Sequence, residues 1–175
     1  MSDDHTLARF EQTALTHLAA AYDLARWLTR NDHDAEDVGQ EAYARAFKSF
    51  GGFHGGDGRA WLLAIVRHTA YSWLQRNCGH ELMMALDEDL HGVDGGTGNP
   101  ETLLLQRANQ QLVKEALKEL PVEFREVVVL RELEEQSYKE IAHITDLPLG
   151  TVMSRLARAR KRLQQSLARR LHTEV

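Results

Sequence analysis

The residues that could do chemistry in this chain are basic, and they gather near its C-terminal end. Residues 147–172 include seven Lys or Arg side chains and no Asp or Glu. Such side chains bind polyanions, so this segment has the charge distribution of a nucleic-acid contact. A basic last helix is also what the helix dipole favours. Charge alone therefore leaves both interpretations open.

The pattern around these bases predicts a helix-turn-helix over residues 137–163. Tyr138 to Ile144 form a short apolar-faced helix, residues 146–150 (DLPLG) break it, and Thr151 is placed to cap the next helix. One face of that helix carries Val152, Leu156, Ala159 and Leu163, and the opposite face carries Ser154, Ala157, Arg158 and Lys161. A small, basic face fits the DNA major groove. The pattern favours DNA binding over an ordinary helical hairpin.

The elements that must position this motif are also predicted to be helices. The chain has 25 Leu and 20 Ala against 13 Val plus Ile, and only 3 Pro, which favours an all-α fold. Helical stripes occur in 5–30, 34–50, 59–77 and 102–120, and we assign the ambiguous Val127-Val128-Val129 run to a helix. In the first stripe the spacing places Leu18 on the buried face, and Asp34 is the expected N-cap of the second helix.

Composition divides the chain into two small helical domains joined by a flexible acidic linker. Residues 1–100 carry a net charge of −7, whereas residues 101–175 carry +2. Between them, residues 79–101 hold six acids, five glycines and no Lys or Arg, a composition that buries little apolar area. We predict domains at 5–78 and 102–172 with a linker at 79–101.

Several protein classes do not fit the composition. The chain has 175 residues and a net charge of −5, and it contains no apolar run near the roughly 18 residues of a membrane span. The start shows no export signal and Cys78 is the single cysteine, so we expect a cytoplasmic protein without membrane insertion. Cys78, His80, Glu81 and His91 match no compact zinc site. We expect no metal and no cofactor. A hydrolase built on the Asp- and His-rich stretch 32–41 is the enzyme alternative.

The helix-turn-helix lies within a longer stretch that resembles a known family. Residues 124–163 (FREVVVLRELEEQSYKEIAHITDLPLGTVMSRLARARKRL) resemble region 4 of sigma-70 family factors of the extracytoplasmic-function (ECF) type. Residues 34–50 (DAEDVGQEAYARAFKSF) resemble region 2.2 of that family, and 61–77 (WLLAIVRHTAYSWLQRN) resemble regions 2.3 to 2.4. The resemblance implies a non-catalytic promoter-recognition subunit. Its partners would be core RNA polymerase (the coiled coil of the largest subunit, and the flap), promoter DNA and an anti-sigma factor.

The resemblance assigns polymerase contacts to the second helix. They are Asp34, Asp37, Gln40, Glu41 and Tyr43. Acids at a helix start are also favoured by the helix dipole, so the residues alone leave a purely structural role open. Gly39 departs from the family pattern, in which a larger residue follows the valine, and it would weaken the interface.

By the same resemblance, the −10 promoter element is read by the third helix and the glycine-rich loop before it. The residues are Phe53, His54, Asp57, Arg59, Arg67, His68, Tyr71, Ser72 and Arg76. There is no acid between residues 58 and 80, so this face can hold phosphates and stack exposed bases. His68 stands where the family commonly has asparagine. Trp61 and Trp73 are assigned mainly to core packing.

The −35 element would be read by the helix-turn-helix. The residues implied are Thr151, Ser154, Arg155, Ala157, Arg158 and Lys161, with Arg131 and Tyr138 positioning phosphates. Met153 stands where a basic residue is frequent. The rival functions are a regulator that binds double-stranded DNA alone and a sigma-like decoy for an anti-sigma protein. The acidic linker further suggests that the free protein binds DNA weakly, through closure of one domain on the other.

Overall fold

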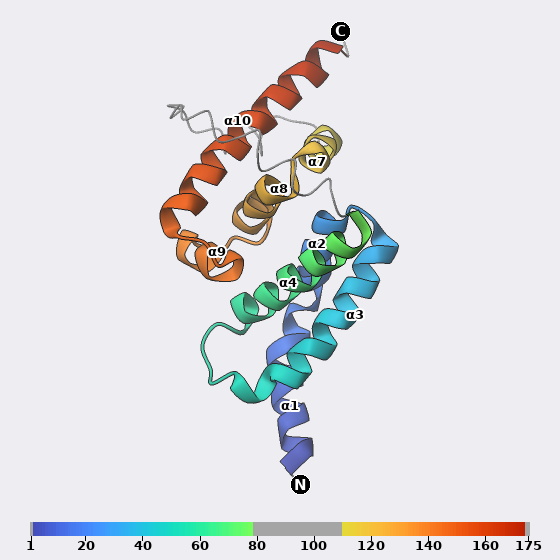
Figure 1. The fold of residues 1–175 in the computed structure, drawn as a ribbon, viewed down its shortest axis with the longest axis vertical. Coiled ribbons are helices and arrows are strands. Elements are labelled where there is room, and N and C mark those ends of the chain that lie inside the picture. Colours follow the sequence, from blue (N-terminus) through green and yellow to red (C-terminus); the bar gives the residue numbers. More distant parts are fainter. Residues whose placement is uncertain (1, 79–109, 174–175) are drawn as a thin grey trace.

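The computed structural model describes residues 2–78 and 110–173, and within these ranges every regular element is a helix (Figure 1). The N-terminal half contains α1 (Ser2–Ala14), η1 (Leu15–His17), α2 (Leu18–Thr29), α3 (Asp32–Ser49), η2 (Phe50–Gly52) and α4 (Gly58–Cys78). The C-terminal half contains α7 (Gln110–Glu119), α8 (Val122–Val128), the π-helical turn η3 (Val129–Leu133), α9 (Tyr138–Thr145) and α10 (Leu149–Thr173). The all-α prediction is confirmed. The predicted linker 79–101, and the start of the helix predicted for 102–120, lie outside the described residues.

The single helix predicted for residues 5–30 is instead two helices separated by the 3-10 turn η1. Phe10, Ala14, Ala21 and Leu28 of the predicted stripe are buried, but Leu18 is 43% exposed. A 3-10 turn winds more tightly than an α-helix, so it changes the direction of the side chains that follow it. The predicted place of Leu18 in the core is therefore wrong.

Helix α3 begins earlier than its acidic pattern predicted. The side chain of Asn31 is the N-cap and accepts a hydrogen bond from the backbone N–H of Asp34 at 3.1 Å. Asp34 is thus a first-turn residue, and its prediction as the N-cap is wrong. Arg30, which ends α2, has a left-handed backbone (φ 59°), and this sharp turn lets α3 start two residues later.

The C-terminal half confirms the helical assignment of the triple valine. Val127 and Val128 lie in α8, Val129 starts η3, and all three are buried, so tertiary packing outweighs their local strand preference. Helix α9 then starts with a capping box between Ser137 and Glu140.

The helix-turn-helix forms as predicted except at one position. Its second helix, α10, begins at Leu149, and Pro148 supplies the carbonyl that accepts a hydrogen bond from the Val152 N–H at 3.1 Å. Thr151 therefore lies inside the first turn, and its prediction as the cap is wrong. The carbonyl of the residue before a helix accepts the first intrahelical hydrogen bond, and here that residue is Pro148, so the helix starts two residues before Thr151.

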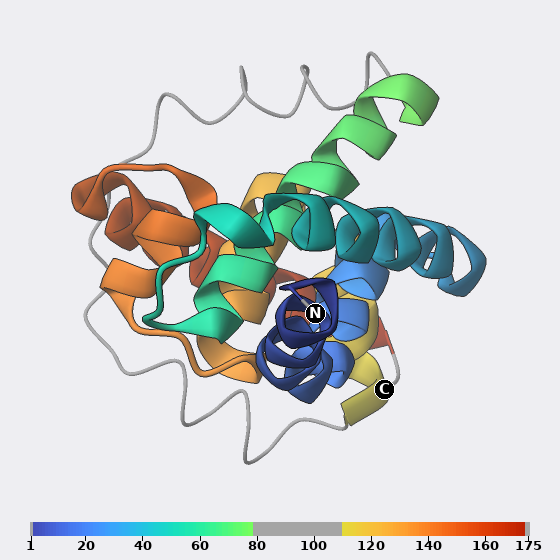
Figure 2. The same cartoon turned by 90° about the horizontal axis from the view of Figure 1, so that it is seen from below.

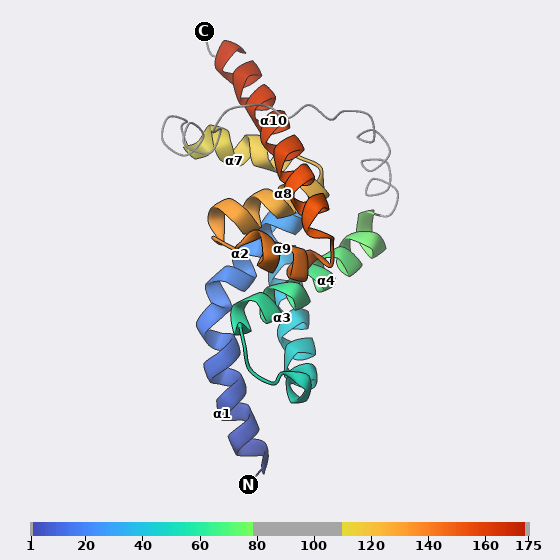
Figure 3. The same cartoon turned by 90° about the vertical axis from the view of Figure 1, so that its left-hand side faces the viewer.

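The two halves pack against each other around a continuous core (Figures 2 and 3). Helix α4 contacts α9, and α2 contacts α8, while α1 and α10 extend to opposite ends of the molecule. Two backbone carbonyls are bonded across the boundary: Arg125 Nη2 donates to Leu28 O at 3.2 Å, and Arg30 Nη1 donates to Lys118 O at 3.1 Å. The two predicted helical bundles thus lie side by side in one closed arrangement.

Candidate nucleic-acid interface

The exposed face of α10 has the character that the sequence predicted. Val152, Leu156, Ala159 and Leu163 are buried against the bundle. Ser154, Ala157 and Lys161 are exposed on the other side, and Arg158 is half-buried beside them. Neither Arg158 nor Lys161 has a hydrogen bond or ion pair with the rest of the described chain. Their charges are available to an external anion.

Two other predicted −35 residues, Arg131 in η3 and Tyr138 in α9, lie at the N-terminal end of the helix-turn-helix. The Arg131 guanidinium lies over the Tyr138 ring, 4.7 Å from its centroid, and Arg131 Nη1 donates to Gln136 O at 3.1 Å. Both side chains are half-buried. They are therefore fixed in place before any ligand arrives, beside the start of α9.

The other predicted basic residue of α10, Arg155, lies on a different side of the helix. It is half-buried and close enough to Glu126 for its charge to oppose, in small part, the rise that burial causes in the pKa of that carboxyl. Helix α10 therefore contributes both to the recognition face and to the boundary between the two halves.

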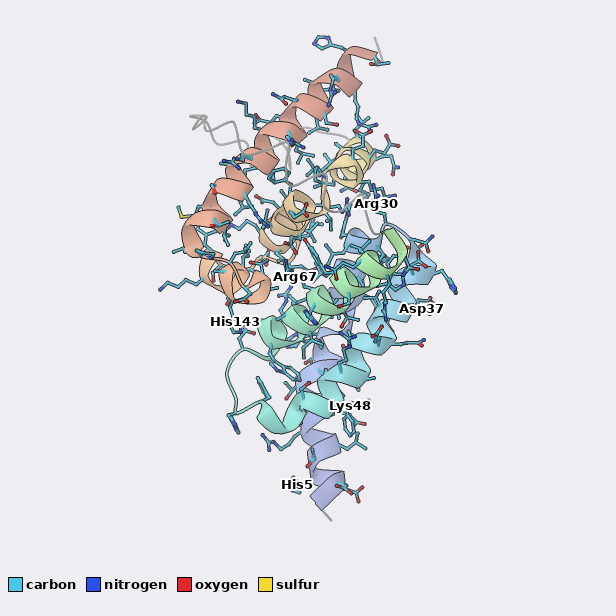
Figure 4. All side chains as sticks on the ribbon, viewed as in Figure 1. His5, Arg30, Asp37, Lys48, Arg67 and His143 are labelled. Atoms are coloured by element: carbon cyan, nitrogen blue, oxygen red, sulfur yellow. The ribbon has the colours of Figure 1, made fainter. Side chains whose placement is uncertain are left out.

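The C-terminal half covers part of the predicted −10 face of α4 and leaves the rest exposed. Arg67 Nε donates to Glu126 Oε2 at 2.9 Å and Arg67 Nη2 donates to Glu126 Oε1 at 3.3 Å, a two-pronged ion pair between α4 and α8. The Glu126 side chain is 0% exposed. The Arg67 guanidinium also lies 4.2 Å from the centroid of the Tyr71 ring. Figure 4 shows Arg67 directed from α4 toward the C-terminal half.

Burial shifts the pKa values of Glu126, Arg67 and Tyr71. It raises the pKa of Glu126, and the nearby Arg67 charge only partly opposes that rise. Burial alone would lower the pKa of Arg67, but its attraction to Glu126 produces a net rise. Burial, followed by the Glu126 charge, raises the pKa of Tyr71 well above its ordinary value. Two predicted DNA contacts, Arg67 and Tyr71, are therefore part of an internal cluster.

A second ion pair covers the start of α4. Arg59 Nη2 donates to Glu134 Oε2 at 2.7 Å, and the Glu134 side chain is 6% exposed. The loop before α4 faces α9 across a hollow of about 460 Å³, whose lining includes His54 and Lys139. Figure 4 shows His143 of α9 next to the start of α4.

The remaining residues of the predicted −10 set differ in their exposure and in their contacts. His68 and Arg76 are exposed, and Ser72 is half-buried. Asp57 caps α4 by accepting hydrogen bonds from the backbone N–H groups of Arg59 at 3.0 Å and Ala60 at 3.2 Å. Phe53 packs against Trp61, with ring centroids 4.9 Å apart. Trp61 and Trp73 are both half-buried against the core, consistent with the packing role assigned to them.

The predicted polymerase face lies on α3, away from the C-terminal half. Asp37 and Gln40 are exposed, and Figure 4 shows Asp37 at the outer edge of α3. Glu41 is half-buried and pairs with Arg45 at 2.7 Å and with Arg76 at 3.4 Å.

Tyr43 belongs to a different surface of α3. Its hydroxyl donates to Ala14 O at 2.8 Å, and its ring packs edge-on against Phe10. Burial, followed by the neighbouring Tyr22, raises the pKa of Tyr43 to about 12. The structure therefore places Tyr43 at the junction with α1 rather than beside the exposed acids.

Sequence reasoning missed the residues that hold the two halves together. These are Glu126, Glu134 and Arg125, each less than one tenth exposed. Burial lowers the pKa of Arg125 to about 10, with the nearby Arg30 charge as the next cause. The sequence did contain a signal for them, because Glu123, Arg125 and Glu126 interrupt an otherwise apolar run, and buried charges need partners.

Two further findings concern the described residues. No helix among residues 2–78 and 110–173 is both long and apolar enough to cross a membrane. The same ranges hold no group of three or more His, Cys, Asp or Glu side chains placed to bind a metal ion. The residues considered for zinc lie outside the described part of the chain, apart from Cys78 at the end of α4.

Comparisons with known proteins identify both halves. The family described as Sigma-70 region 2 matches residues 14–78, and Sigma-70, region 4 matches residues 110–163. The ECF RNA polymerase sigma-E factor of Escherichia coli strain K12 is 36% identical over 141 residues, which cover 77% of this chain and 74% of that protein. The ECF RNA polymerase sigma factor SigE of Mycolicibacterium smegmatis is 35% identical over 167 residues. The match covers 95% of this chain and 65% of that relative's length.

Solved structures agree with the sequence comparisons. The sigma factor RpoE from Bartonella quintana, in complex with the anti-sigma factor NepR, aligns with a TM-score of 0.69 and 28% identity over 91% of this chain and 97% of that one. CnrH, in complex with the cytosolic domain of CnrY, aligns with a TM-score of 0.61 and 26% identity over 91% of this chain and 87% of that one. With region 2 and region 4 in order on one all-α chain, this protein belongs to the sigma-70 family as an ECF sigma factor, a transcription initiation factor that directs RNA polymerase to promoters.

Proposed function

We propose that this chain binds core RNA polymerase and carries both promoter contacts itself, without catalysing a reaction. The division proposed is region 2 at 5–78, a linker at 79–101 and region 4 at 102–172. The observation that carries the proposal is the exposed face of α10, where Arg158 and Lys161 have no partner in the described chain and lie next to small residues. A major groove admits such a helix.

The acids of α3, of which Asp37 is exposed and Asp34 and Glu41 are half-buried, form the proposed contact with the coiled coil of the largest polymerase subunit. Asp34, Asp37 and Glu41 follow each other at helical spacing, so they share one face, and Gln40 lies beside them. Tyr43 contributes by fixing α1 against α3. The flap of the polymerase is the proposed partner of the C-terminal half. Because core polymerase and chromosomal DNA are in the cytoplasm, the protein would act there.

The −10 contact requires the closed arrangement to open. Arg59, Arg67 and Tyr71 are held against the C-terminal half, whereas His68 and Arg76 are exposed. We infer that separation of the halves releases the covered residues for phosphates and unstacked bases of the −10 element. The polymerase, by holding the two regions apart, would supply the free energy of opening.

An anti-sigma factor is the proposed inhibitor. The two structural relatives were each solved as complexes, one with the anti-sigma factor NepR and one with the cytosolic domain of CnrY. A protein that binds only the closed arrangement would stabilise it by mass action. Such a partner would keep the α4 face covered.

Multi-round transcription tests this proposal against its two rivals. Purified core polymerase is given a library of upstream DNA fragments, with and without the protein. We expect start sites that require the protein and that weaken strongly with Arg158→Ala and Asp37→Ala. Arg169→Ala is the matched control, because Arg169 is an exposed base farther along α10.

The rivals predict other outcomes. A regulator of the double-stranded type would bind DNA equally well without polymerase. A decoy would produce no start sites at all while still binding an anti-sigma protein. Either result, with folded protein and active polymerase, would contradict the proposed function.

A further inference from the structure

The first four turns of α10 present an exposed face that carries a methionine. Gly150, Met153, Ser154, Ala157 and Lys161 are exposed there, opposite the buried side of the helix. At about 100° per residue, these five positions fall within roughly 100° of one another. They form one narrow surface, which we name the reading face.

Met153 is the largest apolar group on the reading face. Its side chain is 50% exposed, and Leu149, one turn earlier, is 43% exposed. Single exposed apolar side chains are common on protein surfaces. This pair differs because its neighbours are Gly150, Ser154 and Ala157, which are too small to keep another molecule away from Met153.

The chemistry of the major groove limits what Met153 can recognise. A guanine edge offers two acceptors that suit arginine or lysine, whereas a thymine edge offers its C5 methyl group. The methionine thioether donates no hydrogen bond, and its flexible, polarisable chain packs well against apolar groups. Methionine at this position therefore forms no hydrogen bond with guanine, whereas contact with thymine buries its side chain against the C5 methyl group.

We propose that Met153 is a specificity-determining residue that selects thymine in the −35 element by covering its C5 methyl group. Lys161, farther along the reading face, and Arg158, just outside its edge, supply the phosphate or guanine contacts that hold α10 in the groove. Met153 thus sets which base is preferred, and the basic residues set most of the affinity. This inference rests on the proposed function, since it requires α10 to enter promoter DNA.

Replacement of thymine by uracil tests the contact directly, because it removes only the methyl group. A promoter obtained from the transcription library is prepared with deoxyuridine at each −35 thymine in turn, on either strand. Binding by the complete holoenzyme is then measured for the wild type, for Met153→Ala and for Met153→Lys.

For the wild type we expect about a fourfold loss of affinity at one thymine position, the factor that burial of one methyl group gives. In Met153→Ala that loss should disappear, and Met153→Lys should shift the preferred base at the position toward guanine. Leu171→Ala is the matched control, because Leu171 is an exposed apolar residue of α10 (53%) well beyond the reading face. It should keep the uracil effect.

Each other outcome overturns the assignment. If no thymine position responds to uracil, or if Met153→Ala retains the response, Met153 does not select the base. These results would leave initiation on the unmodified promoter intact, so they are distinct from failure of the proposed function. If the holoenzyme initiates on no fragment, both proposals fall together.

Discussion

Arg67 on α4 and Glu126 on α8 form a two-pronged ion pair, with Nε 2.9 Å from Oε2 and Nη2 3.3 Å from Oε1. The two residues are 59 positions apart in the sequence and belong to different sigma regions. The carboxylate is completely buried, whereas the guanidinium is 19% exposed. An arginine expected to hold DNA therefore balances an internal charge in the closed arrangement.

Removal of the whole Glu126 side chain, which takes away both acceptors of Arg67, should favour opening. In Glu126→Ala the Arg67 charge would remain partly buried without its partner, a situation that costs about 3–5 kcal/mol at buried pairs. The cost applies only to the closed form, because an open form exposes Arg67 to water. We expect a larger distance between fluorophores on α1 and α10, and stronger binding of single-stranded −10 DNA by the free protein. Glu11→Ala, an exposed acid of α1, is the control. An unchanged distance in Glu126→Ala would show that the pair does not hold the halves together.

Closure should also depend on pH through Glu126. Burial raises its pKa in the closed form, so this form binds a proton more readily than an open form with an exposed carboxyl. Closure is then strongest below the ordinary carboxyl pKa and weakens as pH rises through the raised value. The groups that face this site are Arg67, Tyr71, Glu123, Arg125 and Arg155.

The same pair of fluorophores measures this pH effect. As the pH falls toward the ordinary carboxyl pKa, we expect acidification to shorten the distance in the wild type. Glu126→Gln, which cannot titrate there, should remove most of the dependence. An equal response in both proteins would assign the effect to other groups.

Gly39 in α3 is explained by its contact with α2. A Cβ atom at this position would lie 2.6 Å from Cε1 of Tyr22. We therefore expect Gly39→Ala to lower the thermal midpoint, although alanine favours a helix by about 1 kcal/mol over glycine. In a Tyr22→Ala background the same substitution should raise it. Gly51→Ala is the control, because nothing lies within 4 Å of its Cβ position. A higher midpoint for Gly39→Ala alone would mean that the Tyr22 ring moves aside at no cost.

Arg125 should be among the most sensitive positions for stability. Its guanidinium donates to the carbonyls of Leu120 at 2.7 Å, Lys118 at 3.3 Å and Leu28 at 3.2 Å, joining α7, α8 and the end of α2. Methionine would fill similar space but remove this donor from the Leu120 and Leu28 carbonyls, at about 1–3 kcal/mol for each buried group. The Lys118 carbonyl would keep its hydrogen bond from Arg30. We expect Arg125→Met to reduce the free energy of unfolding by several kcal/mol in urea. Arg169→Met, at an exposed position, should change it little.

The helices and the recognition motif could be predicted because their determinants are local. Val152, Leu156, Ala159 and Leu163 repeat at helical spacing, and they are the residues that α10 buries. The two sigma regions are likewise recognisable from contiguous sequence. Cap positions were less predictable: Asn31 precedes α3 and Pro148 precedes α10, whereas Asp34 and Thr151 were expected as the caps.

The sequence by itself determined the fold class, the order of the helices and the basic face of α10, because helical periodicity and charge can be read over a few turns. Only the tertiary structure decided that Arg67 and Arg59 face Glu126 and Glu134, that Tyr43 points toward α1, and that Gly39 makes room for Tyr22. The physical reason is distance along the chain. Such pairings depend on how separate helices approach each other, and burial, rather than local pattern, then selects which charge meets which partner.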